Sequence, residues 1–132
     1  MKSFQVTGSN VDPKPLSSAA NPVRFSRIGM TISANGRRED TGILWETTGD
    51  YNEGTPGTLH AYDASNLANE IWNSDMNPVR DQMGPVTKFV PPTVANGKVY
   101  VPTSDNTVAV YGLLVPNALS PALGSPKTRR PR

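Results

Sequence analysis

Hydrophobic and polar residues alternate along several short stretches of the chain. In Lys98–Thr103, Val99 and Val101 fall on one side of an extended strand, and Leu59 and Ala61 do the same further upstream. A period of two residues is typical of a strand with one buried face. The pattern predicts strands at Lys2–Thr7, Thr31–Ala34, Gly42–Thr47, Gly57–Asp63, Glu70–Asn73, Lys98–Thr103 and Thr107–Leu113, with another that begins at Thr93 or is interrupted by Pro91 and Pro92.

Polar, glycine-rich and proline-rich stretches separate these strands. The sequence predicts loops at Gly8–Asn21, Gly49–Pro56 and Ser74–Pro85. Asn35-Gly36 and Asn96-Gly97 are turn dipeptides, and we expect type I′ geometry with positive φ at both residues of each pair.

The two Asn-Gly turns belong to segments with the same order of elements. Each segment runs from a strand through Ala-Asn-Gly to an aromatic-bearing strand, then through a polar turn to a strand ending in Tyr62 or Tyr111. Repeats of about 40–50 residues with four strands each are typical of propeller blades. The order of elements therefore favours two copies of one structural unit, the second of which lacks a fourth strand after Leu114.

Composition and charge exclude several classes of site. The chain has no cysteine, so disulfides, thiolate metal sites and cysteine nucleophiles are absent. The formal net charge of +2 comes from the final "KTRRPR", because without its four basic residues 9 basic side chains face 11 acidic ones. The rest of the chain therefore lacks the excess of positive charge that is typical of a nucleic-acid-binding surface. No apolar run reaches membrane-spanning length, and the first residues contain no signal-peptide core.

Three stretches of the chain resemble a known repeat. The segments "GTLHAYDASN", "EIW" and "PTVANGKVYVPTSDNTVAVYGL" are similar to the pyrroloquinoline-quinone-type (PQQ-like) β-propeller repeat, in particular to the C-terminal end of large bacterial proteins built from it. The resemblance implies an all-β fold, a partial β-propeller of about two four-stranded antiparallel blades with the last incomplete and with disordered ends. The expected organisation is a poorly ordered segment with one possible strand at 1–24, blades at 25–115 and a Pro/Arg-rich tail at 116–132.

Few residues suggest chemistry. His60 is the single histidine, and a metal site around it would need carboxylates such as Asp63 or Asp75, whereas the plainer interpretation is a surface or packing residue. Acidic residues at Glu46, Asp50 and Glu53 match no calcium-loop spacing, so we expect a solvated loop. Trp45 and Trp72 can stack on a quinone or a sugar, but a strand tryptophan in a propeller more often packs between blades.

Two functional hypotheses follow from the resemblance. The first is a non-catalytic structural or binding module of a larger bacterial repeat protein, whose partners are other propeller blades or a partner chain. The alternative is the remnant of a quinoprotein oxidoreductase, with pyrroloquinoline quinone as its cofactor. The first is preferred because a cofactor site in such a ring draws on several blades, so we expect no catalytic or metal-binding residue and no bound cofactor. The lack of a long apolar run and the charge balance lead us to expect no membrane partner and no nucleic-acid partner, and a contact through the basic "KTRRPR" is the weaker third hypothesis. The parent family is usually exported.

Overall fold

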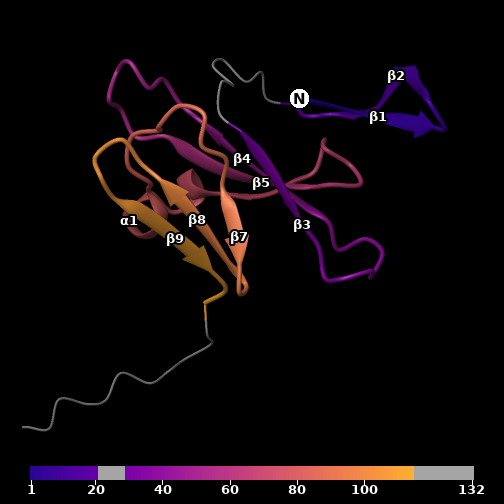
Figure 1. Ribbon diagram of the computed structural model, residues 1–132. Helices are drawn as coiled ribbons and strands as arrows, with labels where there is room; N and C mark the ends of the chain where they lie inside the picture. The colour runs from indigo at the N-terminus through magenta and orange to yellow at the C-terminus, as the bar shows by residue number, and fades with distance from the viewer. Residues whose placement is uncertain (21–28, 115–132) are drawn as a thin grey trace, which may run out of the picture.

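The computed structural model describes residues 1–20 and 29–114, which form three antiparallel sheets, none of them closed into a barrel (Figure 1). The all-β class expected from the sequence is thereby confirmed. The strands are β1 (Lys2–Thr7) and β2 (Asn10–Ser18) in a hairpin, β3 (Met30–Ser33), β4 (Ile43–Thr48), β5 (Thr58–Asp63) and β6 (Glu70–Asn73) in a four-stranded sheet, and β7 (Thr93–Ala95), β8 (Lys98–Pro102) and β9 (Val108–Gly112) in a three-stranded sheet. A 3-10 turn, η1 (Ser74–Met76), and a short helix, α1 (Pro78–Asp81), follow β6.

Both larger sheets are meanders in which each strand pairs with its neighbours in sequence. The β7–β8 turn has the expected type I′ signs, with φ of 50° at Asn96 and 69° at Gly97. The same expectation is wrong for Asn35-Gly36, where only Gly36 has a positive φ, of 60°. The Gly36 amide donates to the Ala34 carbonyl and the Arg38 amide to the Asn35 carbonyl, so two overlapping tight turns begin a longer loop between β3 and β4.

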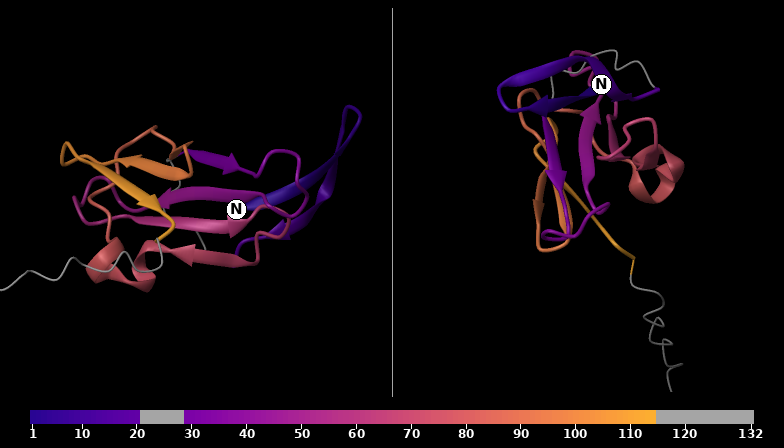
Figure 2. Two further views of the ribbon diagram at one scale, coloured as in Figure 1. Left: turned by 90° about the horizontal axis from the view of Figure 1, so that it is seen from below. Right: turned by 90° about the vertical axis from the view of Figure 1, so that its right-hand side faces the viewer.

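The four-stranded and three-stranded sheets pack face to face, as their edge-on view in Figure 2 shows. Side chains from both sheets form one core, to which the loop after α1 adds Met83 and Val86. Trp72 of β6 meets Tyr111 of β9 edge to face, with 5.6 Å between ring centroids. The buried members of this core are Leu59, Met83, Val86, Val99 and Val101, with Trp45, Trp72, Val94, Ala109 and Tyr111 packed against it.

Two further contacts fix how the sheets meet. Their first strands, β3 and β7, lie side by side, and the Thr31 hydroxyl donates to the Pro92 carbonyl at 2.5 Å. At one end of the sheets, the Gly57 amide donates to the Gly84 carbonyl at 3.1 Å, and Val86 pairs with Thr103 as an isolated β-bridge. The segment after α1 therefore ties the β4–β5 loop to the end of the three-stranded sheet.

Gly57 lies where the β4–β5 loop comes closest to the segment after α1. A Cβ atom there would stand 2.2 Å from Val86 Cγ1 and 2.8 Å from the Thr48 carbonyl oxygen. These separations are far below van der Waals contact, so the position requires glycine on steric grounds.

The opposite face of the four-stranded sheet carries a second, smaller core of Leu44, Tyr62 and Leu67. Met1 and Ala19, at the base of the β1–β2 hairpin, pack against it, and the Leu67 amide donates to Ser17 Oγ at 3.0 Å. The rest of the hairpin projects from this base (Figure 1). The four-stranded sheet is thus covered on both faces.

Several sequence expectations needed correction. The loop expected at Gly8–Asn21 is wrong over Asn10–Ser18, which forms β2, and the loop at Ser74–Pro85 contains η1 and α1. The strand near Pro91 and Pro92 begins at Thr93, because proline cannot donate to the ladder. Lys2–Thr7 and Glu70–Asn73 are strands as expected, and each of the other strand bounds that differ moved by one residue. Residues 21–28 and 115–132, including the expected tail at 116–132 with its "KTRRPR", lie outside the described residues.

Candidate functional site

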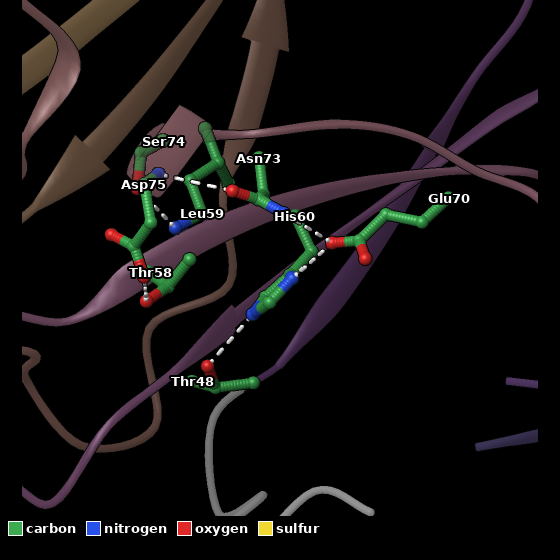
Figure 3. Close-up of polar contacts among 8 residues, drawn as sticks. All are labelled: Thr48, Thr58, Leu59, His60, Glu70, Asn73, Ser74 and Asp75. Carbon is green, nitrogen blue, oxygen red and sulfur yellow. Dashed lines mark hydrogen bonds and ion pairs between the residues drawn. The ribbon is translucent and has the colours of Figure 1, made fainter. Parts of the chain in front are cut away.

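A connected group of polar side chains lies on the face of the four-stranded sheet that is turned away from the three-stranded sheet. Its centre is His60 on β5 (Figure 3). The His60 Nδ1 atom lies 2.6 Å from Glu70 Oε1, and Nε2 lies 2.9 Å from Thr48 Oγ1. The side chains of His60 and Glu70 are only 12% and 20% exposed, so the pair is partly shielded from water.

The strands explain why these residues meet. His60, on the central strand β5, stands opposite Glu46 on β4 and Asn73 on β6. Residues two apart on a strand share a face, which brings Thr48 to the same side as Glu46. A register irregularity in the β5–β6 ladder lies between Ala61 and Tyr62.

Asn73 anchors the acidic end of the group. Its Nδ2 donates to Glu70 Oε1 at 3.0 Å, while its Oδ1 accepts from the Asp75 amide at 3.1 Å and so caps η1 (Figure 3). Next to it, Ser74 Oγ accepts from the Leu59 amide at 3.1 Å. The Glu70 carboxylate is therefore oriented by the same residues that end β6.

Glu46 is the buried charge beside this group. It is 1% exposed, and its Oε2 atom makes no hydrogen bond to any described residue. Burial raises the pKa of this carboxyl, and the nearby His60 and the amino terminus partly oppose the rise. An unpaired buried oxygen is costly, so Glu46 weakens the fold when it is ionised.

The order of groups is carboxylate, imidazole, hydroxyl. A carboxylate accepts hydrogen bonds, so Glu70 favours the tautomer with the proton on Nδ1, which leaves Nε2 to accept from Thr48. This is the connectivity by which a histidine is prepared to take a proton from a hydroxyl. Acyl transfer also requires donors aimed at a developing oxyanion, so this connectivity alone does not define a catalytic site.

Among the sequence candidates, His60 is central but has a different acidic partner. Asp63 accepts from the amide and hydroxyl of Ser65, and these bonds lower the pKa of its carboxyl. Asp75 accepts from Thr58 Oγ1 at 2.7 Å. Neither contacts His60, whose partner is Glu70. Within residues 1–20 and 29–114, no cluster of three or more His, Asp or Glu side chains could hold a metal ion.

The other candidates are dispersed. Glu46 lies within β4, whereas Asp50 receives the Asn52 amide at 2.9 Å in the following turn and Glu53 is exposed. The expected solvated loop is therefore wrong for Glu46. Trp45 donates from Nε1 to Ser33 Oγ at 2.9 Å, and both tryptophans pack against the core between the sheets.

Sequence reasoning missed Thr48, Glu70 and Asn73. The only signal for them was the placement of polar residues opposite His60 on neighbouring strands, which requires the strand register to be known. No helix within residues 1–20 and 29–114 is long and apolar enough to cross a membrane. The chain matches no protein-family model, no curated protein and no solved structure.

Proposed function

We propose that the chain is a β-propeller module whose two larger sheets are neighbouring blades of the PQQ-like type. Its role is structural or binding, within a larger assembly of such repeats, and it is not a catalyst by itself. The observation that carries the proposal is the face-to-face packing of two successive meanders whose first strands, β3 and β7, lie side by side. In a propeller, blades follow one another in this way around a central axis, with their first strands innermost.

The outer face of the three-stranded sheet supports this proposal. Val108 and Val110 are 56% and 51% exposed there, and Val110 stands opposite Tyr100. A blade buries its hydrophobic faces against neighbours on both sides, and repeat arrays need about three units for stability. The exposed apolar face fits a blade whose next neighbour is supplied by another part of the assembly.

The quinoprotein alternative receives no comparable support. A quinone held by stacking needs an available aromatic face, yet Trp45 and Trp72 both pack against the core between the sheets, where Trp72 also meets Tyr111. The described residues therefore do not fit a quinone site built on these tryptophans. A titration with pyrroloquinoline quinone and calcium, followed by tryptophan fluorescence and dye-linked alcohol oxidation, would reveal such a site, and saturable binding with turnover would overturn the module proposal.

Thermal melting with static light scattering tests the module itself. With only two blades, we expect marginal stability, either as an aggregation-prone monomer or as a species that gains stability with concentration. A monodisperse monomer that melts cooperatively above about 55 °C, as intact domains commonly do, would contradict the proposal. As a control, Tyr100→Lys alters the outer face without touching the core between the sheets, and we expect it to reduce aggregation.

A further inference from the structure

The last strand of the three-stranded sheet has a free edge. Within residues 1–20 and 29–114, β9 pairs only with β8. The Thr103 amide donates to the Thr107 carbonyl at 3.0 Å, and the register then runs through Val101–Ala109 and Tyr100–Val110. Because bonded and non-bonded pairs alternate in an antiparallel ladder, the amide of Val110 points away from β8, toward the free edge.

This edge lacks the usual protection. Natural edge strands are very short, carry charges or prolines, or are covered by a helix or loop, whereas β9 reads VAVYG. Its hydrogen bond to α1 comes from a side chain, the Tyr111 hydroxyl, which donates to the Asp81 carbonyl at 3.0 Å and leaves the backbone edge open. The other free edges are better protected. β7 has three residues and follows two prolines, β6 has four residues and begins with Glu70, and β3 lies beside β7. β9 is therefore the most open template for another strand in the two larger sheets.

The hairpin offers a matching strand. Phe4 and Val6 of β1 share one face and are 43% and 59% exposed. Among the described strands β1 pairs only with β2, so its other edge is free too. β2 contains Pro13 and Pro15, which lack amide donors and make it a poor edge. A two-stranded hairpin is marginal in water, so pairing with another sheet would stabilise it.

We propose that β1 of one molecule pairs with the β9 edge of a second copy of this chain. The contact completes the three-stranded sheet with a fourth strand and sets Phe4 and Val6 beside Val108 and Val110. Aromatic and β-branched residues form favourable cross-strand pairs, so the side chains reinforce the backbone hydrogen bonds. The contact depends on free strand edges and not on the propeller arrangement, so it can fail while the proposed function stands.

The positions of the two edges determine the geometry of the assembly. The hairpin is held to the four-stranded sheet by Met1, Ala19 and Ser17, and β9 lies at the opposite end of the molecule in both Figure 1 and Figure 2. One molecule therefore uses different surfaces for its two neighbours, which is a head-to-tail contact. Such contacts produce rings or open chains rather than closed two-fold dimers.

Complementary blocked variants test this geometry. Val110→Pro removes a free-edge amide while leaving the Ala109 and Tyr111 bonds to β8, and Val6→Lys places a charge on the apolar face of β1. We expect the parent chain to grow in mass with concentration in light scattering, and each variant to associate about tenfold more weakly, a difference of about 1.4 kcal/mol. An equimolar mixture of the two variants should form a 1:1 dimer that grows no further, because one intact β1 meets one intact β9.

Engineered cysteines provide a second measurement that does not depend on the folding of the proline variant. The chain has no cysteine of its own, so a Val6→Cys chain mixed with a Val110→Cys chain can form only introduced disulfides. We expect the mixture to give a disulfide-linked heterodimer on mild oxidation. Ile71→Cys, at a position on β6 that is 50% exposed, serves as the matched control for Val110→Cys and should cross-link at least tenfold less.

A monomeric parent chain, or equal cross-linking at Ile71 and Val110, would overturn the proposal. Association that both blocked variants retain and Tyr100→Lys abolishes would also overturn it, since the outer face of the sheet would then be the contact. That last result would leave the propeller module intact, so the two proposals fail in different ways.

Discussion

Replacing Leu59 by alanine tests whether the two larger sheets share one core. Leu59 is fully buried, with 0% exposure, in one core cluster with Val86 of the loop after α1 and Val99 and Val101 of β8. Shortening leucine to alanine removes about three methylene equivalents, or about 2.4 kcal/mol of transfer free energy at about 0.8 kcal/mol each. The cavity adds to this loss, and buried leucine-to-alanine changes cost about 3–5 kcal/mol in total.

Urea unfolding followed by tryptophan fluorescence measures this cost, because Trp45 and Trp72 both contact the same core. With a slope of about 2 kcal/mol per molar urea, the midpoint should fall by about 1.5–2.5 M. Leu113→Ala is the matched control, since Leu113 is 99% exposed and the same substitution there should cost less than about 0.5 kcal/mol. Equal, small effects at the two leucines would refute the shared core and with it the packing of one sheet on the other.

Three further predictions concern single side chains. Glu46→Gln should raise the melting temperature at pH 7, and this gain should fade as the pH is lowered toward the ordinary glutamate pKa. Because the pKa of Glu46 is raised in the folded state, the protein is more stable at low pH and loses that stability as the pH rises. Equal gains at pH 4 and pH 7 would contradict the buried charge. Gly57→Ala should destabilise the fold by more than about 2 kcal/mol in the same urea assay, and a Gly57→Ala, Val86→Ala double variant should recover part of that loss. An unchanged stability of Gly57→Ala would show that Val86 does not pack tightly against this position. Burial raises the pKa of Tyr111 to about 12. The melting temperature of the parent chain should therefore fall faster above about pH 10 than that of Tyr111→Phe. Parallel losses in the two proteins would contradict this shift.

Local pattern was enough to locate most strands. The alternation in Lys98–Thr103 placed Val99 and Val101 on the buried face, and both are indeed buried. Asn96-Gly97 gave the type I′ turn because its two residues tolerate positive φ better than others. Hydrophobic periodicity and turn chemistry depend on residues that are close together in the sequence. Strands and tight turns of this kind can therefore be predicted from the sequence alone.

The β2 strand was missed for a physical reason. Pro13 and Pro15 and a polar composition are typical of a loop, and the burial that normally gives a strand its periodic pattern is largely absent there. The strand exists because it pairs with β1, through a register with two irregularities. Pairing between segments of unequal length is not visible in local alternation.

The polar group around His60 was missed because it depends on register. Glu70 reaches His60 only because the turn from Asp63 to Asn69 closes through the bond from the Asp63 amide to the Asn69 carbonyl at 3.0 Å, and because the β5–β6 ladder shifts beside it. Changing the register by one residue would turn Glu70 to the opposite face of the sheet. Spacing along the sequence suggested Asp63, which is instead used by its own turn.

The close approach at Gly57 affects more than local stability. With Val86 seated directly against the glycine backbone, the β4–β5 loop and the next sheet come nearer than any side chain would permit. The spacing between the β4–β5 loop and the segment that pairs with Thr103 is therefore set by a side chain resting on bare backbone. A methyl group at position 57 would act as a spacer and push these two segments apart at this end of the sheets.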